Sequence, residues 1–327
     1  MGKYIPHKEI IYLDQFALSR LVDSEPGSIW EKLNDLLQEG VEMGRIVVPY
    51  ANDHLIESST SDIGKAVKED AFLFELSKGV MLEIEPEIAA RLLIYKVRNQ
   101  RFGLGAFTTS ATHNGFNSKE EIARYAGLRQ QFDKMVDEGT GMLNMLRDAT
   151  RVSKGQGKKG EKTSLEIIVA MYEKHLRTRL KKISRYGFYD KEGIKFSFIQ
   201  IPFWADTIMD LLIEKYRITK DEARKAENLL GKEGLINTMP THYVRAVLET
   251  MMMIKHQKEK VNDHIDIIRL STAIPFCDIV LTDKIRQYDA KNFKLHSYFK
   301  TEIYSGTAEQ LNMFANRLSE IIHTSGH

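Results

Sequence analysis

Two short apolar segments at opposite ends of the chain most constrain its fold, because each leads into an acidic residue. Ile10-Ile11-Tyr12-Leu13 precedes Asp14, and Ile279-Val280-Leu281-Thr282 precedes Asp283. Each segment is typical of a buried strand. The carboxyl ends of parallel strands share one edge of a sheet, so the two carboxylates can meet although 269 positions separate them. We therefore expect both ends of the chain to enter one α/β sheet.

Further apolar strands are predicted at 46–49, 80–84 and 301–304. Segments with helical spacing lie between them or follow them, at 15–21, 30–44, 51–60, 71–79, 86–100 and 308–322. Strands that alternate with helices favour a parallel sheet with helices on both faces. The expected fold is therefore three-layer α/β/α, with a mostly parallel sheet of about five strands.

The strand signal nearly vanishes between about 103 and 258, which predicts an all-helical insertion at 103–261 that divides an α/β domain formed by 1–102 and 262–327. Residues 152–162 form a Gly/Lys-rich segment that we interpret as a linker. Thr163-Ser164-Leu165-Glu166 has the pattern of a capping box that starts a helix. Helices are also predicted at 206–216, 220–230 and 241–258. The helix from 163 has an apolar inner stripe: Ile168, Tyr172, Leu176, Leu180 and Ile183.

Composition excludes several classes of protein. The single cysteine, Cys277, excludes an intrachain disulfide and fits a reducing compartment. No signal peptide and no membrane-spanning run are recognisable, so we expect a cytoplasmic protein with no membrane partner. No Gly-rich phosphate loop follows a strand, which argues against a nucleotide-binding fold. A phosphatase of the haloacid-dehalogenase type needs an aspartate two positions after Asp14, where Phe16 stands.

Four carboxylates, those of Asp14, Glu57, Asp266 and Asp283, are expected at the same edge of the sheet. Clustered carboxylates repel one another unless a cation neutralises them. Ligands that offer only oxygen select Mg²⁺ or Mn²⁺ over zinc. Such a site can polarise a phosphodiester and lower the pKa of a bound water. Each acid also has a structural alternative, as a helix cap or as part of a solvated helix face.

The order of these motifs resembles that of PIN domains, a family of metal-dependent ribonucleases. In that family an acid ends the first strand, a glutamate follows the second, an aspartate opens a helix, and a threonine and an aspartate follow the fourth. The resemblance covers about 1–100 and 262–327 of this chain. The matching segments are Ile11-Tyr12-Leu13-Asp14, Val47-Val48-Pro49 with Glu57, Asp266-Ile267-Ile268 with Ala273, and Val280-Leu281-Thr282-Asp283. The chain departs from the family where Gln15 and Phe16 follow Asp14 and where Thr282 and Asp283 are adjacent.

The resemblance implies a metal-dependent endonuclease, a hydrolase of phosphodiester bonds with RNA as its substrate. Asp14, Asp266 and Asp283 would bind Mg²⁺ or Mn²⁺, and Glu57 would complete the site or help to activate water. Asp278 is an alternative to Asp283 as a metal ligand, because the position of the acid after the fourth strand is left open.

Two residues are candidates for accessory roles. His54 precedes Glu57 by three positions and could share its helix face to bind a phosphate or a leaving group. Gln15 could hold a ligand carboxylate or a nucleotide. The alternative for His54 is a hydrogen-bonded structural histidine.

A basic stripe recurs at helical spacing within the predicted insertion, at Lys174, Arg177, Lys181 and Arg185. Such a stripe can neutralise phosphates and steer a nucleic acid toward a site. Tyr186, Phe188 and Tyr189 follow it and could stack on unpaired bases. The alternative is a solvated helix face.

Two functions therefore stay open from the sequence. The first is the metal-dependent nuclease, and the second is a catalytically inactive PIN-like scaffold that binds a nucleic acid or a protein. The formal net charge of +2 does not decide between them. A homo-oligomer is compatible with either.

Overall fold

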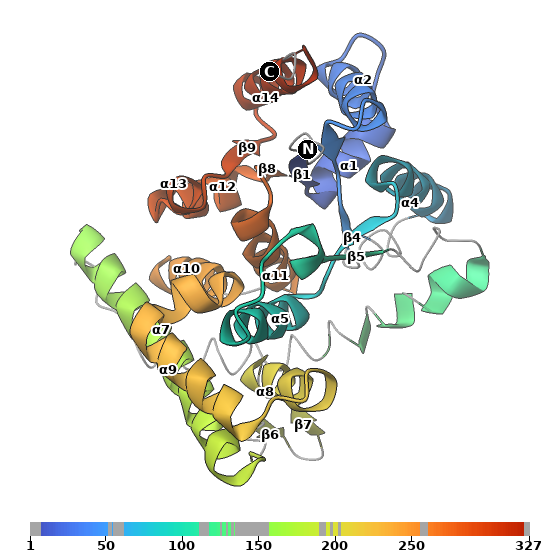
Figure 1. Cartoon of the computed structure of the whole chain (residues 1–327). Helices are drawn as coiled ribbons and strands as arrows, with labels where there is room; N and C mark the ends of the chain where they lie inside the picture. Colours follow the sequence, from blue (N-terminus) through green and yellow to red (C-terminus); the bar gives the residue numbers. More distant parts are fainter. Residues whose placement is uncertain are drawn as a thin grey trace, which may run out of the picture.

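The computed structural model describes residues 8–51, 54, 62–110, 118–124, 126–128, 130–131, 134, 157–189, 194–196, 199–201, 204–255 and 261–323. Figure 1 shows an α/β fold with a large helical part. The strands are β1 (Glu9–Leu13), β2 (Ile46–Val47), β3 (Tyr50–Ala51), β4 (Val80–Leu82), β5 (Thr108–Ser110), β6 (Ile194–Phe196), β7 (Ile199–Ile201), β8 (Ile279–Thr282) and β9 (Glu302–Ser305).

Helices account for most of the remaining described residues. In the first half of the chain these are α1 (Gln15–Val22), α2 (Ile29–Glu42), α4 (Ile63–Ser77), α5 (Glu85–Val97) and the short 3₁₀ helix η1 (Leu104–Ala106). In the second half they are α7 (Gly157–Tyr186), α8 (Trp204–Asp210), the π-helix η2 (Leu211–Lys215), α9 (Lys220–Thr238), α10 (Pro240–Ile254), α11 (Val261–Phe276), α12 (Lys284–Asn292), α13 (Leu295–Phe299) and α14 (Ala308–His323).

A four-stranded parallel sheet joins the two ends of the chain, in the order β2-β1-β8-β9. Leu13 of β1 is in register with Leu281 of β8, so these two strands end side by side. A second sheet, β3-β4-β5, has β3 parallel to β4 and β5 antiparallel to it. β2 and β3 are separated only by Val48 and Pro49, where proline has no N–H to donate to a strand ladder. The single strand predicted at 46–49 is therefore two short strands, β2 in the first sheet and β3, which ends at Ala51, in the second.

Helices cover both faces of the parallel sheet, because successive side chains of a strand point to opposite faces. Ile11, Leu13, Ile279 and Leu281 pack with residues of α1, α2, α4 and α14. Tyr12, Val280 and Ile303 point the other way and pack with residues of α10 and α11. The expected layered α/β arrangement with a parallel sheet is confirmed.

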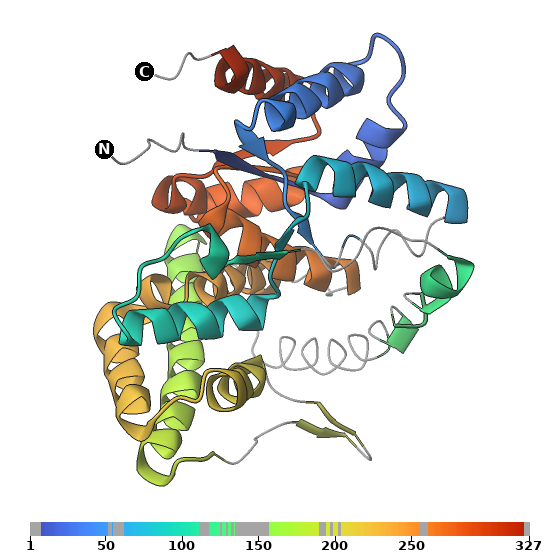
Figure 2. The same cartoon turned by 45° about the vertical axis from the view of Figure 1, so that its right-hand side comes forward.

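A separate helical core lies beyond the sheet and is seen in the lower half of Figure 2. α7 and α9 lie side by side in it, with α5 and α8 packed against them. The predicted apolar stripe of α7, from Ile168 to Ile183, is buried in this core. α9 bends at Gly234, whose φ of 73° lies in the left-handed region, and Glu173 of α7 accepts the next backbone N–H.

Three local predictions were wrong. α7 already begins at Gly157, so Thr163 lies inside a helix and does not start one. The part of the predicted linker that the structure describes, 157–162, is helical. The predicted insertion is not all-helical, since it contains β5 and the antiparallel pair β6–β7. The domain boundaries at 103 and 261 stay a prediction, and packing crosses them: α5 belongs to the helical core, whereas α10 covers the sheet.

Within the described part of the chain, none of the helices combines the length and the apolar character that crossing a bilayer requires.

Candidate active site

Asp14 lies at the carboxyl end of β1 and is the N-cap of α1. The residue is only 7% exposed. One carboxylate oxygen accepts the Gln15 backbone N–H at 2.8 Å, and the other accepts the Thr282 hydroxyl at 3.0 Å. Arg269 of α11 places a guanidinium nitrogen 3.7 Å from the first oxygen. The capping alternative therefore holds for Asp14, and the same carboxylate also faces the next strand and a buried cation.

Asp283 has the corresponding position on the neighbouring strand. It directly follows β8 and is the N-cap of α12, where its carboxylate accepts the backbone N–H groups of Ile285 and Arg286 at 2.6 and 3.0 Å. Because β1 and β8 are parallel and in register at their tips, Asp14 and Asp283 lie at the same edge of the sheet. Thr282 links the two aspartates, because it directly precedes Asp283 and its hydroxyl donates to Asp14.

Asp266 lies in the second turn of α11, where it faces a buried arginine from α12. Arg286 is 2% exposed, and its Nε lies 3.8 Å from Asp266 Oδ2. The same guanidinium contacts Asp263 at 2.5 Å and Asp289 at 3.4 Å. Asp289 is also paired with Lys255. Burial raises the pKa of Asp289, while Lys255 and Arg286 act in the opposite direction.

We call the linked group Asp14, Asp263, Asp266, Asp283, Asp289, Lys255, Arg269 and Arg286 the carboxyl-edge cluster. Among the described residues, it brings together five carboxylates and three cations. Sequence reasoning found three of the aspartates and missed both arginines. The signal was present, because Asp266 and Arg269, like Asp283 and Arg286, are three positions apart. That spacing brings side chains to one side of a helix.

His54 is held by the backbone of two strands. Its Nδ1 accepts the Ala51 N–H at 3.2 Å, so Nε2 carries the proton and donates to the Leu13 carbonyl at 3.0 Å. The ring is 2% exposed and stacks on Tyr12. Burial, with a further contribution from Arg269, lowers the pKa of His54 to about 3. A neutral ring with both nitrogens engaged is not placed to bind a phosphate, so the structural alternative is favoured.

The other predicted site residues lie elsewhere. The side-chain amide of Gln15 donates to Glu69 of α4 at 2.9 Å. Asp278 precedes β8 and accepts the Ile10 backbone N–H at 2.8 Å, at the amino end of the strands. It is therefore at the opposite edge of the sheet from Asp14 and cannot replace Asp283. Glu57 lies outside the described residues.

In the ranges that the structure describes, no group of three or more His, Cys, Asp or Glu residues is arranged to hold a metal ion. The physical reason is visible in the carboxyl-edge cluster, where guanidinium groups stand between the carboxylates. Two of these ion pairs, Arg269–Asp14 and Arg286–Asp266, exceed the length of a hydrogen bond.

A cavity of about 170 Å³ opens at the carboxyl ends of β3 and β4, and α11 forms part of its wall. Its walls include Ala51, Leu82, Arg245 and, from α11, His264 and Thr272. Arg245 pairs with Glu85 at 2.8 Å and with Glu249 at 2.9 Å. The cavity is thus mainly apolar with a few anchored polar groups, the usual character of a ligand pocket.

The basic stripe of α7 is exposed at all four predicted positions, Lys174, Arg177, Lys181 and Arg185. The first three line a cleft of about 420 Å³ between α7 and α9, but Glu173 and Glu227 line it too. Arg177 is paired with Glu227 at 3.3 Å. Of the three aromatic residues that follow the stripe, Tyr186 and Phe188 are each 61% exposed and Tyr189 is buried.

Comparisons of the chain with protein-family models, with curated proteins and with solved structures return no match.

Proposed function

We propose that this protein is a metal-dependent nuclease that hydrolyses phosphodiester bonds at the carboxyl edge of its parallel sheet. The observation that supports it best is the gathering of five carboxylates in the carboxyl-edge cluster. The two strand-tip aspartates and the α11 acids converge there from distant parts of the sequence. Clustered carboxylates repel one another, and a divalent cation bound among them relieves that repulsion.

The donor atoms suit Mg²⁺ or Mn²⁺, because Asp14, Asp266 and Asp283 offer only oxygen. The long Arg269–Asp14 and Arg286–Asp266 ion pairs are weaker than the bidentate contacts that arginine usually makes with carboxylates. Together with Glu57, these aspartates would hold the ion. When bound, it would polarise the phosphodiester and lower the pKa of the attacking water.

The remaining residues of the site organise it. Arg269 and Arg286 place positive charge among the carboxylates and hold Asp14, Asp263, Asp266 and Asp289 near one another. The Thr282 hydroxyl fixes the orientation of Asp14. His54 ties β1 to β3 through its two ring nitrogens and takes no part in proton transfer.

RNA is the favoured substrate, and the support for it is the resemblance of the strand-tip motifs to PIN domains. The cavity at the carboxyl ends of β3 and β4 would receive the sugar or base next to the scissile bond, because its apolar walls suit a ring. α11 contributes residues both to this cavity and to the carboxyl-edge cluster.

The test is cleavage of labelled RNA and DNA with Mg²⁺ or Mn²⁺ by the Asp14→Asn variant. Asparagine preserves the helix cap but removes the charge. We expect cleavage to fall by more than about a hundredfold with an unchanged circular dichroism spectrum. Asp35→Asn, an exposed change on α2, serves as the matched control and should cleave normally. Full activity of Asp14→Asn would exclude the proposed site.

A second candidate function is a catalytically inactive scaffold that binds a nucleic acid or a protein. The observation that favours it is the placement of Arg269 and Arg286 among the acids, where they already neutralise part of the charge. Calorimetric titration with Mn²⁺ separates the two. A nuclease site should bind the ion in the wild type and not in Asp14→Asn, whereas a scaffold should bind none in either.

A further inference from the structure

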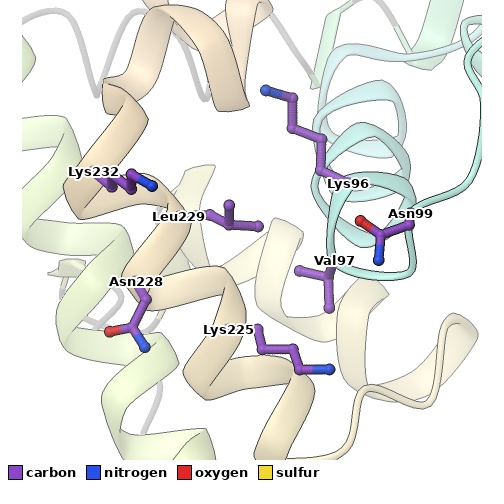
Figure 3. Close-up of a pocket in the computed structure, with 7 residues that line it drawn as sticks. All are labelled: Lys96, Val97, Asn99, Lys225, Asn228, Leu229 and Lys232. Carbon is purple, nitrogen blue, oxygen red and sulfur yellow. The ribbon is translucent and has the colours of Figure 1, made fainter.

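A groove between α5 and α9 combines three lysines with two asparagines (Figure 3). Its volume is about 330 Å³. Lys96 comes from the end of α5 and Asn99 from just after that helix, whereas Lys225, Asn228 and Lys232 come from α9. None of the described residues that line it is acidic. This separates it from the α7–α9 cleft on the predicted basic stripe, which two glutamates line.

The positive charge of the groove is only partly compensated. Lys96 forms an ion pair with Glu233 at 2.7 Å. Lys225 and Lys232 are exposed, and neither forms an ion pair with any part of the chain that the structure describes. Like charges held in one groove repel one another, and a bound anion relieves that repulsion. The chemistry of the groove is therefore that of an anion site with two available ammonium groups.

The floor of the groove is apolar. Val97 and Leu229 point toward each other between the two helices, with the three lysine side chains around them (Figure 3). Asn99 and Asn228 add amide groups that can donate to and accept from a polar ligand. A small inorganic anion would leave this floor unused. A chain that alternates phosphates with flat, partly apolar units uses the lysines and the floor together.

We propose that the α5–α9 groove binds the backbone of a single-stranded nucleic acid, with its phosphates at Lys225 and Lys232 and its sugars and bases on the Val97–Leu229 floor. The link to catalysis rests on the proposed nuclease function. α5 begins beside the cavity at the carboxyl edge and ends at the groove, and its 13 residues span about 20 Å. At the rise of about 3.4 Å per nucleotide of a fully stacked strand, at most about six nucleotides cover that distance.

The experiment measures binding of a fluorescently labelled oligouridylate of about 20 nucleotides by anisotropy, in EDTA and over a range of salt concentrations. The variant is Lys225→Gln with Lys232→Gln. Each lost phosphate contact lowers the salt slope by about 0.7, so the pair should lower it by about 1.4 and weaken binding about tenfold or more. Lys32→Gln with Lys68→Gln, on exposed faces of α2 and α4, makes the same charge change and should bind like the wild type.

A second pair, Lys174→Gln with Lys181→Gln, tests the competing stripe on α7 with the same spacing of seven positions. The groove assignment is overturned if this pair loses the affinity while the groove pair keeps it, or if the Lys32 and Lys68 pair loses as much. It is also overturned if the wild type does not bind the oligonucleotide, or binds anionic phospholipid vesicles through the same two lysines instead.

The two proposals fail separately. Binding through the groove without cleavage in Mg²⁺ or Mn²⁺ would remove the nuclease function and leave the groove assignment intact. If cleavage and binding are both unchanged in the Lys225 and Lys232 variant, the groove assignment is removed and the nuclease function is left intact.

Discussion

Arg286 shows how a single side chain can define the candidate site. It is almost fully buried, yet it contacts Asp263, Asp266 and Asp289 from one guanidinium group. A planar group with five donors can serve several carboxylates at once, which an ammonium group does less well. Burial of this charge is tolerated only because carboxylates surround it. The arginine and the acids therefore depend on each other, and removal of either side has a predictable cost.

Replacing Arg286 by methionine should destabilise the protein by about 3–5 kcal/mol at neutral pH, because the neighbouring carboxylates lose their buried partner. The destabilisation should shrink as the pH falls, since protonation relieves unpaired acids. Added Mn²⁺ should stabilise the variant more than the wild type. Denaturant unfolding measures each effect.

Arg224→Met is the control, because its ion pair with Asp221 has similar spacing but is exposed, and its loss should cost less than about 1 kcal/mol. Equal effects of the two substitutions would contradict this account of Arg286.

The buried histidine His54 predicts a loss of stability in acid. Its pKa in the folded state is about 3, below the ordinary value of 6.5, because burial and Arg269 disfavour the charged ring. The unfolded chain therefore binds a proton between about pH 6.5 and 3 that the folded chain does not bind, and folding loses free energy as the pH falls through that window. The contribution approaches about 1.4 kcal/mol per pH unit. His54→Gln should be less stable at pH 7 but should show a shallower decline. Unfolding curves at several pH values test this, and parallel declines for both proteins would contradict it.

At the scale of elements, the apolar pattern predicted those strands and helices whose position depends on packing. It failed to predict features that depend on one residue. β1, β8 and the inner stripe of α7 were predictable because their apolar residues recur with the period of a strand or a helix. Pro49 divides the second strand between two sheets, an effect of a single missing N–H. Gly157 and the lysines after it suggested a linker, yet α7 includes them. Local propensity was overridden there by continuation of a long, well-packed helix.

The candidate site was predictable in outline for a similar reason. Asp14 and Asp283 follow apolar strands, so topology alone places them at one edge. Arg269 and Arg286 were missed because arginine is usually exposed, and its burial depends on partners that lie far away in sequence. Asp278 was misjudged because a strand of four residues has acids at both ends, and only the register shows which end faces the site.

At the scale of the whole molecule, two helices join parts that the sequence suggested were separate. α5 starts at the carboxyl edge of the sheet and packs into the helical core, whereas α10 leaves the helical core and covers the sheet. Elements shared by two cores couple their stabilities, because neither core is complete without them. The cavity at the carboxyl ends of β3 and β4 and the α5–α9 groove lie at the two ends of α5.

We therefore expect the protein to unfold in one cooperative transition, although it exceeds the size at which such behaviour is usual. Leu248→Ala removes a buried side chain from the sheet core, and Leu212→Ala removes one from the helical core. Each should cost about 2–5 kcal/mol, and both should lower the midpoint of the same transition in differential scanning calorimetry. Met313→Ala, at a position that is 49% exposed on α14, should leave the midpoint almost unchanged. Two resolved transitions, each sensitive to only one of the leucine substitutions, would show instead that the sheet and the helical core unfold independently.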